Sequence, residues 1–314
     1  NKKYQQRSAE FSVDEGTTAG NRLFNKPLPE ALAIAEAYME KKGMDYDPGK
    51  PFNTLDTDAA QEIAAAYDAM LHDPKNPEVK KAYEALAKET ADQYDAILEE
   101  GFVLEINNNE PYSSSKDMIE DLASNKRMKI FSTEFGFGAE AITDDQRADN
   151  PLLRDSGYKD VNGQTLLMND LFRGVHDFFG HSKRGNGFGP KGEENAWDVH
   201  SRMYTPIARR AMTSETRGQN SWVNFSGVNE EAFKVRDKAR RLRKEGRTNE
   251  ADLVKKVYDE MMSYAEQKIG LMPEKYTVNP YIEGGDLDFS LDENFVVSDV
   301  VNTEVETKGD PNLD

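Results

Sequence analysis

The sequence predicts a mainly α-helical fold with a small β element. Three observations support this. Long segments rich in Ala, Glu, Lys and Leu carry apolar residues at helical spacing, strand-like composition is confined to short stretches, and no apolar run is long enough to span a bilayer. With 314 residues, 37% of them hydrophobic and 31% charged, the chain can bury a sizeable core. We expect a compact α-helical metal-site domain with an N-terminal helical layer.

Composition divides the chain into four segments. Residues 1–25 are polar and dotted with glycine, and should form an N-terminal arm. Residues 26–105 should form the helical layer, and residues 106–280 a metal-binding catalytic domain. Residues 281–314 should form an acidic C-terminal tail.

The helical layer should contain three helices. Their apolar residues recur at helical spacing, and proline or an N-capping residue stands at each expected start. Helices of this composition most often serve only to pack, so we assign them no chemistry. The expected helices run from Pro29 to Gly43, from Thr57 or Asp58 to about Leu71, and from about Asn76 to Glu100.

The β element should lie after Gly101, where the composition changes. FVLEI at 102–106 is typical of a strand, and MKIFSTEFGFG at 128–138 of a strand that leads into a glycine-broken turn. A short helix from Ser115 to Ala123 should separate them.

The segment from Leu167 to Gly185 holds two of the four histidines, His176 and His181, among apolar residues at helical spacing. It predicts a buried helix that starts near Asn169 or Asp170. On a regular helix two residues five apart point about 140° away from each other. The two imidazoles can converge only if the helix ends or distorts between them, and Gly180 is well placed for that.

Three further helices are expected downstream. The first, from about Glu193 to Arg210, carries Trp197 and His200. The other two run from Glu230 to Lys244 and from Asn249 to Ile269, and their charge runs are most simply solvated faces.

Net charge and cysteine content exclude several functions. The net charge is −18, so neither nucleic acid nor a membrane is expected as the main partner. There is no cysteine, so any metal must be held by nitrogen and oxygen ligands, and secretion through disulfide-forming routes is not expected. We expect a cytoplasmic or virion-associated protein. Because the chain starts at Asn1 without a methionine, we expect it to be part of a larger polypeptide or of a virion assembly.

A glycine-rich loop, SKRGNGFGPKG at 182–192, follows the histidines. Such a loop beside paired histidines suits a lid or a substrate entrance. It lacks the GxxxxGK[ST] pattern and a preceding strand, so we reject a phosphate-binding P-loop.

The hexapeptide HDFFGH at 176–181 resembles the iron-binding signature H-[DE]-x-x-G-H of the pterin-dependent aromatic amino acid hydroxylases. The resemblance implies that His176 and His181 bind Fe(II), that a later glutamate completes a facial triad, and that a pterin could be a cofactor. Glu215 in TSETRG is the best match for this glutamate, with Glu193, Glu194 and His200 as alternatives. More loosely, residues 168–225 resemble an uncharacterised domain of phage-encoded proteins.

The chemistry of this ligand set agrees with the resemblance. Two imidazoles and one carboxylate hold Fe(II) by one face and leave positions open, and they would also suit a catalytic Zn, or Mn. We assign supporting catalytic roles to Asp177, His200 and Glu194. Binding of a small-molecule substrate that carries a carboxylate or phosphate is assigned to Arg202, Arg209 and Arg217.

Three functions are compatible with these features. The first is a mononuclear Fe(II)-dependent oxygenase, most simply a hydroxylase. The second is a divalent-metal phosphohydrolase of the HD kind, suggested by the dipeptide His176–Asp177, although the earlier histidine, His72, lies about a hundred residues upstream. The third is a non-enzymatic virion-associated or structural domain.

Overall fold

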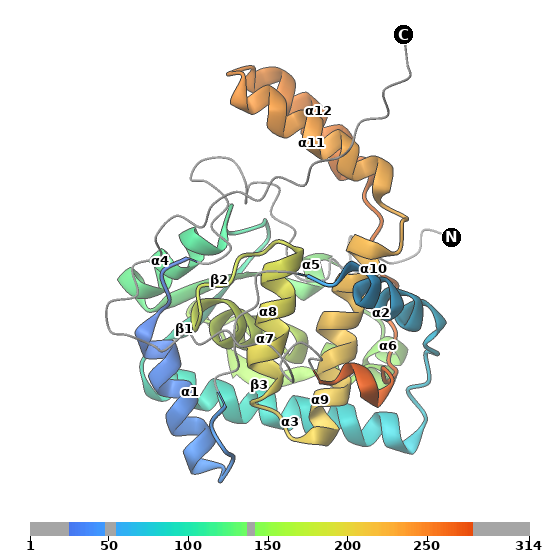
Figure 1. Cartoon of the computed structure of the whole chain (residues 1–314). Coiled ribbons are helices and arrows are strands. Elements are labelled where there is room, and N and C mark those ends of the chain that lie inside the picture. The colour runs from blue at the N-terminus through green and yellow to red at the C-terminus, as the bar shows by residue number, and fades with distance from the viewer. Residues whose placement is uncertain (1–24, 48–54, 137–141, 279–314) are drawn as a thin grey trace.

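The computed structural model describes residues 25–47, 55–136 and 142–278. The expected N-terminal arm, except for its last residue, and the expected acidic tail lie outside these ranges. Within them the fold is mainly α-helical with two small β-sheets, as the sequence predicts (Figure 1). None of the described helices is long and apolar enough to cross a membrane.

The three predicted N-terminal helices are present as α1 (Pro29–Lys41), α2 (Thr57–Ala69) and α3 (Pro77–Glu99). Prolines stand in the first turns of α1 and α3, where a missing N–H leaves no helical hydrogen bond unmade. The N-cap of α2 is Asp56, one residue before the earlier of the two predicted caps, because its carboxylate accepts a hydrogen bond from the backbone of Ala59.

The small β element forms two separate two-stranded sheets. The strands β1 (Val103–Asn107) and β2 (Arg127–Phe131) are parallel, and α4 (Ser115–Asn125) connects them. The strands β3 (Asp155–Lys159) and β4 (Thr165–Leu167) form an antiparallel hairpin directly before the histidine segment. Along the chain, the two sheets are separated by two short helices and a 3₁₀ turn. These are α5 (Thr133–Gly136), α6 (Asp144–Asp149) and the turn at Pro151–Leu153.

The C-terminal half is helical, and two of its helical segments have the wider π geometry. These are η2 (Asp177–Ser182) and η3 (Ser214–Gly218). The α-helices of this half are α7 (Met168–His176), α8 (Pro190–Ser201), α9 (Pro206–Thr213), α10 (Gln219–Phe225), α11 (Glu230–Lys244) and α12 (Thr248–Met261).

Two predicted helices are wrong in extent. The helix expected from Glu193 to Arg210 is split into α8 and α9, because the backbone is extended at Thr205 before Pro206 starts a new helix. The helix expected from Asn249 to Ile269 ends at Met261, after which Met262 is extended.

Most buried apolar side chains of the described residues belong to two large clusters, and a third, small cluster consists of Ile142, Leu153 and Leu167. The main core joins residues of α1, α3, α4, α7, α8 and α9 with both strands of the parallel sheet. The second core joins residues of α2, α10, α11 and α12 with Met272 of the C-terminal segment. Figure 1 shows α3 running beneath the body, while the α11–α12 hairpin projects away from it.

Candidate metal centre

The change of helix type after α7 brings the two histidines to one side. In the π turn η2 hydrogen bonds join residue i to residue i+5, which is the separation of His176 and His181. Gly180 permits close packing here: a Cβ atom at this position would lie 3.1 Å from the carbonyl oxygen of Ala196 and 3.1 Å from Cε1 of His176. The predicted distortion near Gly180 is therefore present, as a wider turn rather than a helix end.

A carboxylate from the first turn of α8 completes a group of three ligands. Oε2 of Glu193 lies 3.9 Å from Nε2 of His176 and 3.6 Å from Nε2 of His181. One ligand atom from each of the three residues lies within 4.8 Å of the other two. Two ligands that each bind a metal at about 2.1 Å are about 3.0–3.4 Å apart at angles of 90–110°, so the carboxylate oxygen would have to move closer to each imidazole by less than about 1 Å.

A chain of hydrogen bonds determines which nitrogen of His176 faces this group. The side-chain amide of Gln93 donates to the carbonyl of Met203, so its oxygen accepts a 2.9 Å hydrogen bond from Nε2–H of His200. Nδ1 of His200 must then accept the 3.0 Å hydrogen bond from Nδ1–H of His176. This leaves Nε2 of His176 with a lone pair directed at Glu193.

His181 is oriented in the same way by the loop that follows it. Its Nδ1 lies 3.3 Å from the carbonyl oxygen of Asn186 and donates to it, so the lone pair is on Nε2. The side-chain amide of Asn186 donates to the carbonyl of Gly180 at 2.8 Å, which fixes this loop against η2. Hydrogen bonds of this kind are typical of metal-ligating imidazoles.

The ionisation of the surrounding groups agrees with these assignments. Burial holds the pKa of His200 well below its usual value, and the neighbouring His176 and Lys183 lower it further, so His200 is neutral. Burial alone would raise the pKa of Glu193, but positive charge on the two imidazole rings outweighs it and the pKa falls below its usual value; a bound cation would act in the same direction. Glu193 is therefore a carboxylate.

The donor set fits a cation. Two imidazole nitrogens and one carboxylate oxygen direct lone pairs at one another in a space without solvent, since His176, His181 and Glu193 are 2%, 0% and 5% exposed. Nε2 of His176 is fully buried and has no hydrogen-bond partner within the described part of the chain. Facing acceptors repel unless a positive charge lies between them, and nitrogen and oxygen donors suit Fe(II), Zn(II) or Mn(II).

Glu215, the predicted third ligand, does not belong to this group. Its carboxylate accepts hydrogen bonds from Tyr83 at 2.5 Å, from Gln219 at 2.9 Å and from Gln267 at 2.8 Å. Of the predicted alternatives, the residue whose carboxylate converges with the two imidazoles is Glu193. The carboxylate that converges with the imidazoles follows His181 by twelve residues in sequence and comes from α8 rather than from the TSETRG segment.

The three residues expected to support catalysis differ in position. His200 contacts the ligand His176 directly. Asp177 is fully buried next to both imidazoles, and burial raises its pKa although the histidines and Arg173 oppose this. Glu194 points to another partner, Arg217, with which it forms a buried ion pair, and burial raises its pKa despite that charge.

The three arginines predicted to bind substrate are engaged within the fold. Arg202 pairs with Asp47 and, at 3.1 Å, with Asp198. Arg209 donates to two backbone carbonyls at 2.8 and 3.2 Å. Arg217, besides its ion pair, lies 3.9 Å above the ring of Trp197 and donates to the backbone of the C-terminal segment. These contacts hold helices together, and substrate binding by the three arginines stays a prediction.

The glycine-rich loop is a packed wall rather than a lid. Most of its residues are buried, and the ring of Phe188 lies 4.9 Å from that of His181. A Cβ atom at Gly185, whose φ is +72°, would lie 2.0 Å from a backbone oxygen of Asn25. A Cβ atom at Gly192 would lie 1.9 Å from the backbone oxygen of Gly187. The glycines are there because the backbone approaches itself closely.

Sequence reasoning missed Gln93, Asn186 and Lys183. Gln93 had a visible signal, because it falls on the apolar stripe of α3 where a polar side chain needs a buried partner. Lys183 is also buried; its Nζ donates to the carbonyl of Val199 at 3.2 Å, and burial lowers its pKa to about 7.

Neither family models, nor curated proteins, nor solved structures match this chain.

Proposed function

We propose that this protein is a mononuclear non-haem metal enzyme, an Fe(II)-dependent oxygenase that hydroxylates a small organic substrate. The observation that carries the proposal is the convergence of Nε2 of His176, Nε2 of His181 and Oε2 of Glu193 in a buried space. Two imidazoles and one carboxylate bind one face of a metal and leave the opposite positions open. When bound, Fe(II) would supply the reducing centre that oxygen chemistry requires.

The surrounding residues have supporting tasks that follow from their contacts. Gln93 and His200 hold the imidazole of His176 in the tautomer that presents Nε2. Phe179 and Phe188 are fully buried against His200 and His181, and Phe178 is fully buried against Phe179; together these rings keep water out. A dry site limits the loss of reactive species to solvent.

The phosphohydrolase alternative is less well supported. Its ligand set needs an earlier histidine beside the HD pair, but Nδ1 of His72 accepts a 3.0 Å hydrogen bond from the backbone of Ile269. Asp177 is not among the residues whose ligand atoms converge.

Burial favours a second candidate, a structural metal site without turnover. All three ligands are at most 5% exposed, so a substrate could reach them only if a covering segment moved. Structural sites are closed, whereas catalytic sites keep an open coordination position. The two candidates thus differ in whether a small molecule can bind the metal.

Metal content and nitric oxide binding test both candidates. After anaerobic loading with Fe(II), we expect one iron per chain in the wild type and in Glu215→Gln, but less than a tenth of that in Glu193→Ala. Nitric oxide should then give the EPR signal of an Fe(II)–nitrosyl adduct if a position is open, and oxygen uptake with ascorbate or a tetrahydropterin should accompany it.

Two results would contradict the proposal. Iron loss in Glu215→Gln with retention in Glu193→Ala would restore the sequence-based ligand set. Stoichiometric iron without any nitrosyl signal would leave the structural site as the function of this centre.

A further inference from the structure

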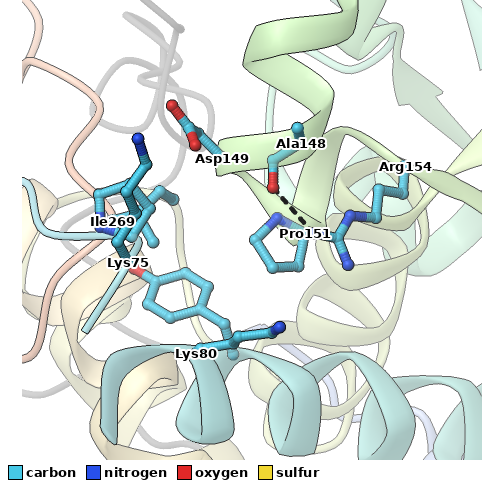
Figure 2. A pocket seen from close by; sticks show the side chains of 9 residues that line it. Lys75, Lys80, Ala148, Asp149, Pro151, Arg154 and Ile269 are labelled. Atoms are coloured by element: carbon cyan, nitrogen blue, oxygen red, sulfur yellow. Dashed lines mark hydrogen bonds between the residues drawn. The ribbon is translucent and has the colours of Figure 1, made fainter. Parts of the chain in front are cut away.

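A cavity of about 270 Å³ lies in a different part of the protein from the histidines (Figure 2). The loop before α3 contributes Lys75, and the first two turns of α3 contribute Lys80 and Tyr83. The opposite wall is formed by the end of α6 and the segment that follows it, up to Arg154. None of the residues that line this cavity belongs to the group of His176, His181 and Glu193, so the two sites are distinct.

The wall of the cavity is positively charged although the whole chain carries a net charge of −18. Lys75, Lys80 and Arg154 line it against a single carboxylate, that of Asp149. Figure 2 shows the side chains of Lys75, Asp149 and Arg154 around the same space. A local excess of positive charge in an acidic protein indicates an anionic ligand.

These cations are only weakly neutralised by the protein. Within the described residues Lys75 makes no ion pair, and Lys80 has only the exposed Glu84, at 3.9 Å. The guanidinium of Arg154 donates to the backbone carbonyls of Arg147 at 3.1 Å and Ala148 at 2.9 Å. These two bonds fix its position, and no carboxylate in the described part of the chain forms an ion pair with it.

The cavity also has an apolar side. Tyr83, Pro151 and Ile269 are part of the lining, and Tyr83 and Ile269 are almost fully buried. The hydroxyl of Tyr83 is hydrogen-bonded to Glu215 and the residue is 0% exposed, so Tyr83 forms part of the apolar backing of the cavity and offers it no polar group. A ligand with one charged end and one apolar end would match both sides.

We propose that this cavity binds a small organic anion. Its phosphate or carboxylate group would face Lys75, Lys80 and Arg154, and its apolar or aromatic part would lie against Tyr83, Pro151 and Ile269. This site is separate from the predicted anion clamp of Arg202, Arg209 and Arg217, none of which lines the cavity.

Calorimetric titration of the full chain with phenyl phosphate tests the site, with benzoate, inorganic phosphate and phenol as comparison ligands. We expect saturable binding of phenyl phosphate, weaker binding of inorganic phosphate and none of phenol. Relative affinities of phenyl phosphate and benzoate decide between a phosphate and a carboxylate ligand. Binding should be at least tenfold weaker in the double variant Lys75→Gln, Lys80→Gln.

Two controls isolate the cavity. Lys81→Gln removes an equally exposed charge of α3 that does not line the cavity, and should bind phenyl phosphate like the wild type. His181→Ala removes a proposed metal ligand and should also leave this binding unchanged, so the cavity is tested separately from the metal centre. Equal affinity in the double variant and in Lys81→Gln, or no saturation by either anion, would overturn the proposal.

Discussion

Gln93 shows how a single uncharged side chain can determine the chemistry of a buried site. It donates to the carbonyl of Met203 and accepts from His200, so its amide has only one orientation that satisfies both contacts. Because Nε2–H of His200 donates to Gln93, Nδ1 of His200 must accept from Nδ1–H of His176. Nε2 of His176 is then the nitrogen available to a metal. The N-terminal helices were expected only to pack, but α3 thus supplies a residue that positions the imidazole of His176.

We expect Gln93→Leu to weaken metal binding about 10–100-fold, the usual effect of removing a hydrogen-bond partner that orients a ligand. Leucine leaves His200 free to adopt the other tautomer, which no longer accepts from His176. Titration with Zn(II) as the probe metal measures the change. Gln93→Glu keeps an acceptor for His200 and should recover most of the affinity.

Thr90→Val is the matched control, because Thr90 lies one turn earlier on the same face of α3. Its hydroxyl shares a buried 2.9 Å hydrogen bond with Tyr204 rather than with Gln93 or a histidine. The variant should lose about 1 kcal/mol of unfolding free energy and keep its metal affinity. Equal loss of affinity in Thr90→Val and Gln93→Leu would mean that general loosening of the core, rather than the tautomer, controls the site.

The residues of the ligand group could be only partly predicted. His176 and His181 stood out because histidine is rare in this chain and these two flank a glycine at a known ligand spacing. Choosing between Glu193 and Glu215 requires the packing of α8 against the π turn, which depends on contacts between distant segments. Sequence separation gives no information about such contacts, and the resemblance to the aromatic amino acid hydroxylases favoured Glu215, which lies farther from the histidines in sequence.

At the scale of elements, the π turn η2 makes the site possible. Proline and polar capping residues predicted most helix starts, because their effects depend on neighbours within one turn. The π turn was not predicted, since no local residue pattern separates five-residue hydrogen bonding from regular helix. The break before α9 was missed although Pro206 is a local signal for it. Gly180 is the one residue in the local sequence that indicates this turn, and α8 packs directly against it.

We expect Gly180→Ala to lower the unfolding free energy by about 1–3 kcal/mol, as overpacking of a tight contact does. The added Cβ meets the carbonyl oxygen of Ala196 and Cε1 of His176, each at 3.1 Å, so α8 and the imidazole must move apart. Because α8 carries Glu193, metal affinity should fall as well. Urea unfolding and Zn(II) titration measure the two effects.

Gly174→Ala is the control for Gly180→Ala, since it overpacks α7 on the side that faces β1. Its Cβ would lie 2.6 Å from Cδ1 of Leu104, away from the ligand group. This variant should lose stability but keep its metal affinity. If Gly180→Ala binds metal as tightly as Gly174→Ala, the close approach of α8 is not what positions Glu193.

At the scale of the whole molecule, Glu215 lies where the two cores meet. It accepts hydrogen bonds from Tyr83 of the main core and from Gln267 of the C-terminal segment, and its charge also affects Tyr67 of the second core. Burial raises the pKa of Glu215 to about 7, although the hydrogen bonds from Tyr83, Gln267 and Gln219 oppose the increase. A carboxyl group in this position links the stability of the entire fold to pH.

The direction of this pH dependence follows from the pKa of Glu215 in the unfolded chain and its pKa in the folded protein. Between the ordinary value of 4.5 and about 7, the folded protein holds a proton at Glu215 that the unfolded chain has lost. Raising the pH through this window removes the proton from the folded state only, so the free energy of unfolding falls, by on the order of 3 kcal/mol. Above pH 7 both states are ionised and the contribution of Glu215 becomes constant.

Glu215→Gln should lack this slope, because glutamine does not titrate and fills the same space. Urea unfolding of both proteins between pH 5 and pH 8, with a chelator present so that metal binding does not contribute, isolates the effect as a difference between two curves. His200 and other groups titrate in both proteins and cancel in that difference. The advantage of the wild type over Glu215→Gln should shrink as pH rises to 7 and then level off; parallel curves would show that Glu215 is ionised throughout and that its hydrogen bonds outweigh its burial.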